Sequence, residues 1–166
     1  MADNIRFEGN AMQIINKMND EFAAFLEEAS GELETQTKRN MDKLIHSTGN
    51  TKQNWKHVVD EGKLEAVVGN PLQTAIWLEF GTGDYALEGK GRKGGWWIKV
   101  GNGTNEISPS DAAAYGWKKV RKDKDGNLTY VFTTGMKPKR PLHKAKESTK
   151  GKIQRMFAQT CKKIGD

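Results

Sequence analysis

The chain has 166 residues, of which 36% are hydrophobic, so it is long enough to bury one core, and we expect a single domain over residues 1–166. Its net charge of +6 suits nucleic acid, an acidic protein or an acidic membrane surface, and charge alone does not choose among them. The single cysteine, Cys161, excludes an internal disulfide. No apolar segment is long enough to cross a bilayer and the first ten residues do not resemble a leader, so we expect synthesis in the cytoplasm.

The first predicted element is a long amphipathic helix that starts at about Asn10. Apolar residues recur at steps of three and four, the spacing of one helix face; they are Met12, Ile15, Met18, Phe22, Phe25, Leu26, Ala29, Leu33, Met41, Leu44 and Ile45. Gly31 makes a helix less stable by about 1 kcal/mol relative to alanine. We nevertheless favour one continuous or nearly continuous helix over two. It should end by residues 47–50, where glycine and asparagine are typical helix stops.

The spacing of apolar residues then changes from that of a helix to that of a strand, which predicts a β-hairpin around a turn at residues 60–63. The apolar residues on its two sides are Trp55, Val58 and Val59, then Leu64, Ala66, Val67 and Val68. Pro71 favours a short helix over residues 74–80, with a strand as the less favoured alternative. We expect its apolar residues, Ile76, Trp77, Leu78 and Phe80, to be buried. Glu79 then needs a cation or a place at the edge of the core.

Residues 82–95 are rich in glycine and charge, and we expect a mobile loop there. A strand is predicted at residues 96–100, a brief helical turn at 110–115 capped by Ser108 or Ser110, and a hairpin formed by residues 117–121 and 128–133. A last helix should run from about Pro141 to Ile164. The predicted fold is α+β, with a long N-terminal helix, a small and mostly antiparallel sheet, a C-terminal helix, and a loop-and-hairpin insertion at about 83–134.

No constellation of residues predicts catalysis, a cofactor or a metal. His46, His57 and His143 lie far apart and lack the ligand spacing of a metal site, so we interpret them as surface or capping histidines. The glycine-rich segment 89–95 lacks the spacing of a phosphate-binding loop and is better interpreted as a flexible, basic loop. We therefore predict that the protein is not an enzyme.

Basic residues beside tryptophans leave two interpretations open. Two clusters of such residues could stack on bases and neutralise phosphates: Arg92, Lys93, Trp96 and Trp97, and then Trp117, Lys118, Lys119, Arg121 and Lys122. The same aromatic residues suit a small β core or a protein interface. We favour the core or the protein interface and keep a basic nucleic-acid-binding protein as the alternative function.

Three separated motifs resemble one family. Residues 48–55 (Thr-Gly-Asn-Thr-Lys-Gln-Asn-Trp) resemble a Thr-Gly-Asn-Leu-x-x-Ser-Ile turn, and residues 75–82 (Ala-Ile-Trp-Leu-Glu-Phe-Gly-Thr) are similar to a Tyr-Ala-x-Tyr-Val-Glu-Phe-Gly-Thr signature. Residues 135–145 (Gly-Met-Lys-Pro-Lys-Arg-Pro-Leu-His-Lys-Ala) resemble a Gly-Met-x-Pro-x-Pro-Phe-x-x-Ala motif that leads into the last helix. The family is that of the neck, or tail-completion, proteins of tailed bacteriophages, the lambdoid head–tail joining type. The motif residues are Thr48, Gly49, Trp77, Glu79, Phe80, Gly81, Thr82, Met136, Pro138, Arg140 and Pro141.

This resemblance implies a structural virion protein without catalytic activity or cofactor. Such a subunit assembles with itself into a ring, expected to be sixfold, at the neck or tail-proximal end of the virion. Its other partners are the head connector or stopper and the tail terminator or tube proteins. It is made in the host cytoplasm and needs no membrane, and weak contact with packaged DNA is compatible with this role.

A closed ring requires two different complementary surfaces on each subunit. We hypothesise that acidic residues of the first helix meet a neighbour's basic last helix or loops; the acidic residues are Glu27, Glu28, Glu32 and Glu34. The candidate interface residues opposite them are Arg92, Lys93, Trp96, Trp97, Lys144 and Lys150. For Glu79 we predict an ion pair that ties the Glu-Phe-Gly-Thr turn to the start of the last helix, with Lys137, Lys139 or Arg140 as partner.

Overall fold

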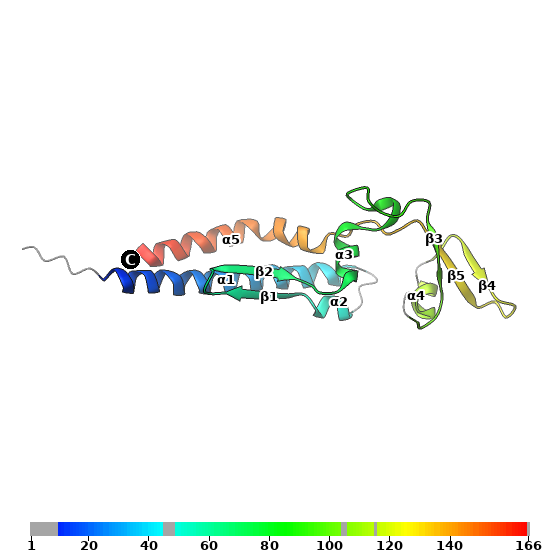
Figure 1. Ribbon diagram of the computed structural model, residues 1–166, viewed down its shortest axis with the longest axis horizontal. Helices are drawn as coiled ribbons and strands as arrows, with labels where there is room; N and C mark the ends of the chain where they lie inside the picture. Colours follow the sequence, from blue (N-terminus) through cyan, green and yellow to red (C-terminus); the bar gives the residue numbers. More distant parts are fainter. Residues whose placement is uncertain (1–9, 45–48, 104–105, 115, 166) are drawn as a thin grey trace, which may run out of the picture.

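Two antiparallel helices form the long axis of the molecule (Figure 1). The computed structural model describes residues 10–44, 49–103, 106–114 and 116–165. Helix α1 (Ala11–Asp42) is unbroken and passes through Gly31, and α5 (Pro141–Gly165) runs back along it. Both predicted helices are confirmed, including the continuity of the first one.

Small residues line part of the seam between these helices and let the two backbones approach closely. They include Ala29, Ser30, Thr37, Ala145 and Thr149, all buried. Each of these three hydroxyls donates to the carbonyl four residues earlier in its own helix, at 2.6 Å for Ser30, 2.7 Å for Thr37 and 2.8 Å for Thr149. Their burial therefore leaves no hydroxyl without a hydrogen bond.

The predicted first hairpin lies along α1 (Figure 1). Strands β1 (Lys56–Asp60) and β2 (Glu65–Gly69) pair antiparallel, with Val58 opposite Val67. Side chains alternate between the two faces of a strand, and the half-buried row contains His57, Val59, Ala66 and Val68. Val58 and Val67 point away from this row and remain exposed.

The core lies where the end of α1, the start of the hairpin, α3 (Gln73–Phe80) and the start of α5 converge. Its buried members are Met41, Trp55 and Ala75, against which Leu44, Val68, Leu78 and Leu142 pack. Asn70 positions α3, because its side-chain oxygen accepts the N–H of Leu72 at 3.0 Å and thereby turns the chain into the helix.

A second, separate sheet occupies one end of the molecule (Figure 1). Its strands are β3 (Trp96–Lys99), β4 (Val120–Lys122) and β5 (Leu128–Thr133), all antiparallel and in the order β3-β5-β4. Helix α4 (Pro109–Ala114) packs on β5, and Ala112 and Val131 are buried. Ser108 caps α4 as predicted, accepting the N–H of Asp111 at 3.1 Å.

The mixed α+β fold is thus as predicted, and it differs from the prediction in four places. The strands form two small sheets instead of one. The strand predicted at residues 117–121 begins only at Val120, as β4. Residues 49–53 form a short helix, α2 (Gly49–Gln53), where the first motif suggested a turn. Residues 82–95 do not begin as a free loop, because they start with a 3₁₀ turn, η1 (Gly83–Tyr85), and the N–H of Leu87 donates to Phe80 O at 2.9 Å. Among the described residues, no helix is long and apolar enough to span a membrane.

Candidate assembly surface

The second and third sequence motifs are joined by backbone contacts. The N–H of Thr82 donates to Met136 O at 2.9 Å, and the N–H of Met136 donates to the Thr82 hydroxyl at 2.9 Å. These bonds close residues 81–83 onto residues 134–138, and we call the pair of segments the glycine clasp. The clasp confirms the expectation that the two motifs lie near each other.

Glycine is required in the clasp because the two backbones approach too closely for a side chain. A Cβ on Gly83 would lie 2.2 Å from Thr134 O, and a Cβ on Gly135 would lie 2.1 Å from Thr82 O. Both glycines also have positive φ, +61° and +117°, which glycine adopts without steric cost. Gly83 and Gly135 therefore allow close packing between two segments that are far apart in sequence.

Glu79 caps the last helix. Its two carboxylate oxygens accept the backbone N–H groups of Leu142 and His143, both at 3.0 Å, and these are the second and third residues of α5. Free N–H groups and the helix dipole both favour an anion at this end of a helix. The predicted tie between Glu79 and the start of α5 is confirmed. The predicted ion pair is wrong, because within the described residues Glu79 pairs with none of its three proposed partners, Lys137, Lys139 and Arg140.

Helix α5 needs this outside acceptor because the residues at its own start supply none. Arg140 precedes the helix with φ +56°, and an arginine side chain has only donors. Pro141 has no N–H, so the first N–H that requires an acceptor belongs to Leu142. The N–H groups of Lys139 and Arg140 both donate to Leu78 O, at 2.8 and 3.1 Å, and hold this segment on the end of α3.

The first motif also reaches α3. Gly49 begins α2, and the hydroxyl of Thr51 lies 2.9 Å from that of Thr74 in α3. The side-chain amide of Asn70 donates to Thr51 O at 2.7 Å. Thr48 lies outside the described residues. All three motifs therefore converge on α3.

One side of α3 presents apolar side chains to solvent. Ile76, Trp77 and Phe80 are 56%, 42% and 48% exposed, and we call these three residues the α3 ridge. The predicted burial of the apolar run is wrong for the ridge, although Ala75 is buried and Leu78 packs against the core. Leu87, in the segment that folds back on Phe80, is 49% exposed and extends the apolar surface.

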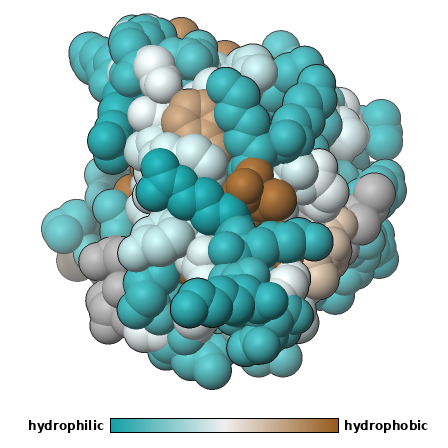
Figure 2. All heavy atoms as spheres, turned by 90° about the vertical axis from the view of Figure 1, so that its right-hand side faces the viewer, coloured by the Kyte–Doolittle hydropathy of each residue, from teal (hydrophilic) through white to brown (hydrophobic). Residues whose placement is uncertain are grey.

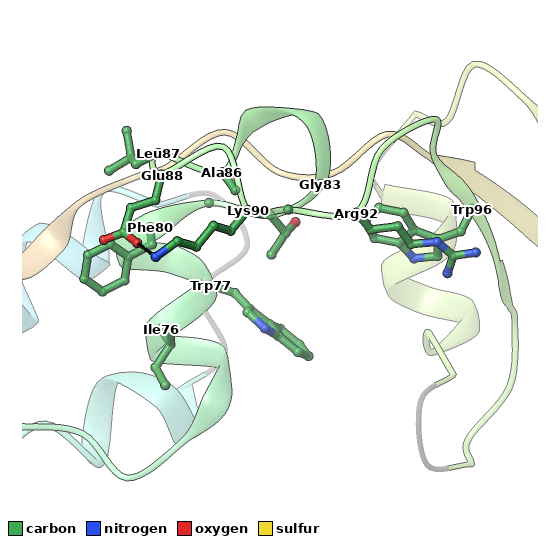
Figure 3. A pocket seen from close by; sticks show the side chains of 13 residues that line it. Ile76, Trp77, Phe80, Gly83, Ala86, Leu87, Glu88, Lys90, Arg92 and Trp96 are labelled. Atoms are coloured by element: carbon green, nitrogen blue, oxygen red, sulfur yellow. Dashed lines mark hydrogen bonds and ion pairs between the residues drawn. The ribbon is translucent and has the colours of Figure 1, made fainter.

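Two open grooves flank the ridge. The first encloses about 520 Å³ beneath residues 81–91, and Trp77 points toward the space between α3 and the Arg92 and Trp96 side chains (Figure 3). The second encloses about 540 Å³ between α3, the first hairpin and the start of α5. Ile76 and Phe80 line both grooves. An apolar ridge between two hollows is a shape suited to receiving side chains of another protein.

The composition of α3 offered a signal for this surface that the prediction did not use. Residues 75–78 and 80 are all apolar, so the side chains surround the helix instead of forming one stripe. A helix that is apolar on all sides must be covered on all sides. One side is covered by the core of the chain. None of the three ridge residues, and not Leu87, was among the predicted interface residues.

Three of the four acidic residues predicted at an interface have partners within the chain. Glu32 pairs with Lys152 of α5 at 2.8 Å. Glu27 and Glu34 lie about two helical turns apart, and both bind the ring of His57, at 2.9 Å to Nε2 and 2.6 Å to Nδ1. Glu34 also pairs with Lys38. Glu28 is exposed and has no ion pair in the described part of the chain.

The basic and aromatic candidates lie on different parts of the molecule. Lys144 and Lys150 are exposed on α5, and Lys93 is exposed in the loop before β3. The Arg92 guanidinium lies 5.4 Å from the centre of the Trp96 ring, and Trp97 stacks edge-on against Phe132 at 5.3 Å in the second sheet. Charge pairing between subunits stays a prediction.

The surroundings of His57 change its protonation. Hydrogen bonds to Glu27 and then to Glu34 raise the pKa of His57 above its ordinary value of 6.5, against the opposing effect of burial. Burial opposes ionisation of Glu34, but hydrogen bonds from Lys38 and His57 outweigh it and lower the pKa of that carboxyl. The charged forms of both groups are therefore favoured in the folded protein.

We expect this cluster to make stability depend on pH. The contribution of His57 is fully present below pH 6.5 and is lost as pH rises through its raised pKa; that of Glu34 is present above 4.5 and is lost as pH falls through its lowered pKa. Urea unfolding from pH 6 to 9 should show wild-type stability falling relative to His57→Gln, by about 1.4 kcal/mol for each unit of the pKa shift. Glu27→Gln should reduce this difference, and parallel curves for wild type and His57→Gln would contradict the assignment.

Comparison with models of known families, with curated proteins and with solved structures finds no match for this chain. Among the described residues, no group of three or more His, Cys, Asp or Glu side chains could hold a metal ion. The family resemblance therefore rests on the three motifs, and any function must be inferred from these motifs and from the surface of the molecule.

Proposed function

We propose that this protein is a structural subunit, without enzymatic activity, that assembles with copies of itself into a ring at the neck of a tailed phage. The ring joins the head connector to the tail. The single observation that carries assembly is the α3 ridge, which the described part of the chain leaves exposed. The neck location comes from the resemblance of the three motifs, whose convergence on α3 is consistent with one shared structural purpose.

The extended shape of the chain favours a partner. Its accessible surface is 11,999 Å² for a mass of 18.6 kDa, whereas a compact monomer of that mass has about 8,200 Å². Trp77 and Phe80 belong to the residue types that most often anchor protein interfaces. Burial of the ridge removes apolar area from water and so favours association.

A ring also needs a second surface that differs from the first. The outer face of the first hairpin supplies one, because Val58 and Val67 lie directly opposite each other and are 69% and 66% exposed. This face and the α3 ridge lie on different elements, so one subunit can use both at once. Contact between unlike surfaces produces a ring when the rotation from one subunit to the next closes.

The proposal is tested by the sedimentation of wild-type protein and of the Ile76→Lys variant. Wild type is expected to sediment as one large species of uniform mass. Ile76→Lys is expected to weaken association at least tenfold, because it places a charge where apolar surface is buried. The fold should be retained, since Ile76 is more than half exposed.

Met12→Lys is the matched control, because Met12 is also apolar and exposed but lies in the first turn of α1. Figure 1 shows that α1 begins far from α3 along the long axis of the molecule. Met12→Lys should assemble like wild type. Unchanged assembly of Ile76→Lys, with melting temperatures showing that all three proteins are folded, would rule out the α3 ridge as the contact.

A further inference from the structure

The positive charge of the chain is concentrated on one lobe. Residues 90–134, which include the second sheet, carry nine Lys and Arg against four Asp and Glu, so five of the six net positive charges lie in this segment. Figure 2 views the end of the molecule that this lobe forms, and hydrophilic side chains cover most of it. Helix α5 carries seven Lys and Arg against one Glu, but α1 beside it carries three against seven Asp and Glu, so the two paired helices largely offset each other. Much of the positive charge that no neighbouring element offsets therefore lies around the β3-β5-β4 sheet.

The strand register places several of these cations on one face of the sheet. Residues directly opposite each other in antiparallel strands share a face, so Trp97 with Phe132, and Arg121 with Tyr130, lie on the same side. Lys122 follows Arg121 on the edge strand β4, where a register shift brings it opposite Leu128. Val131 points to the other side, where it is buried. We call the first side the basic-aromatic face.

Cations cover the rings on this face. The Arg121 guanidinium lies 4.3 Å from the centre of the Trp97 ring and 6.0 Å from that of Tyr130, and Lys119 Nζ lies 5.2 Å from that of Phe132. Such contacts hold a cation in place without neutralising it. Within the described residues, no carboxylate pairs with Lys119, Arg121 or Lys122, whereas Lys99 on β3 pairs with Glu106 at 2.8 Å.

We propose that the basic-aromatic face binds the phosphate backbone of duplex nucleic acid, without reading its sequence. A duplex presents about one negative charge per 1.7 Å and releases counterions when its phosphates are neutralised, so exposed cations gain affinity from it. An exposed ion pair with a protein carboxylate gains only about 0–1 kcal/mol. A guanidinium held flat on a ring keeps the donors at its edge, which match a phosphate.

The same geometry disfavours single strands. Binding of a single strand relies on bases that stack on free aromatic faces. Here Arg121 occupies a face of Trp97 and Lys119 occupies a face of Phe132. The groups presented outward are then cations, which contact phosphates and not bases.

The test is fluorescence anisotropy of a labelled 20-base-pair duplex, titrated with full-length protein from about 25 to 200 mM salt. The variant is Lys119→Gln and Arg121→Gln combined. The matched control removes one lysine and one arginine from the exposed side of α5, as Arg155→Gln and Lys162→Gln combined. Sedimentation of all three proteins ensures that they are compared in the same oligomeric state, so the result does not depend on whether a ring forms.

The sheet variant is expected to bind at least tenfold more weakly at the lowest salt, and its slope of log K against log salt should be smaller by about 2, one per lost phosphate contact. The α5 control should lose much less affinity for the duplex. Equal losses in both variants would overturn the proposal in favour of diffuse charge attraction. Tighter binding of a single strand, or equal competition by poly-glutamate or by acidic lipid vesicles, would also overturn it.

Discussion

Replacing Gly135 by alanine is expected to lower the free energy of unfolding by at least about 4 kcal/mol, among the largest effects of a single substitution. The new Cβ would lie 2.1 Å from Thr82 O and 2.8 Å from Gly83 Cα, and both neighbours are backbone atoms that cannot rotate away. Relief would require residues 81–83 and 134–138 to separate, which breaks the hydrogen bonds of the glycine clasp. Urea unfolding monitored by circular dichroism measures the loss.

Gly126→Ala separates this clash from the cost of positive φ alone. Gly126 has φ +85° in the turn between β4 and β5, and a Cβ there would meet no heavy atom within 4 Å. Its replacement should cost only about 1–2 kcal/mol. If Gly126→Ala lowers the free energy of unfolding as much as Gly135→Ala does, close packing in the glycine clasp does not explain why glycine is needed at position 135.

Glu79→Ala should destabilise the protein by about 3 kcal/mol, because two N–H groups at the start of α5 lose a charged acceptor. For a chain of this size the melting temperature should fall by about 6–12 °C. Glu79→Gln should lose less, since its amide oxygen can still accept one of the two bonds. Thermal unfolding of the three proteins orders them as wild type, Gln variant and Ala variant.

Lys139→Ala distinguishes the helix cap from an ion pair. The side chain of Lys139 is exposed, whereas its backbone N–H holds Leu78 O and is kept in the variant. The stability of this variant should stay within about 0.5 kcal/mol of wild type, so its melting temperature should change by no more than about 1–2 °C. A loss as large as that of Glu79→Ala would instead support pairing between these two side chains.

Local elements could be predicted from the sequence because they depend on local patterns. The three-and-four spacing in α1 outweighed the cost of Gly31, and Pro71 indicated a short helix just after it, which the structure has as α3 from Gln73. The clasp could be anticipated only as proximity of two motifs. That Gly83 and Gly135 pack against each other's neighbours depends on contacts between residues more than 50 positions apart.

The partner of Glu79 was not predicted because a carboxylate was expected to pair with a cationic side chain, here Lys137, Lys139 or Arg140. Backbone N–H groups at a helix end can also bind a carboxylate, although they carry no formal charge. The available signal was the Arg140-Pro141 start of α5, which has no capping side chain of its own. The ridge was wrongly predicted to be buried within the chain. An apolar run does not distinguish side chains that pack in the core of their own chain from side chains that another protein would cover.

The most direct test of ring assembly through the α3 ridge is electron microscopy of the purified full-length protein, compared with Ile76→Lys under the same conditions. Wild-type protein is expected to form closed rings with a uniform number of subunits and with the α3 ridge at each boundary between subunits. The Ile76→Lys variant is expected to appear as dispersed single subunits. Wild-type particles that remain single subunits, or rings in which the ridge faces solvent, would contradict this mode of assembly.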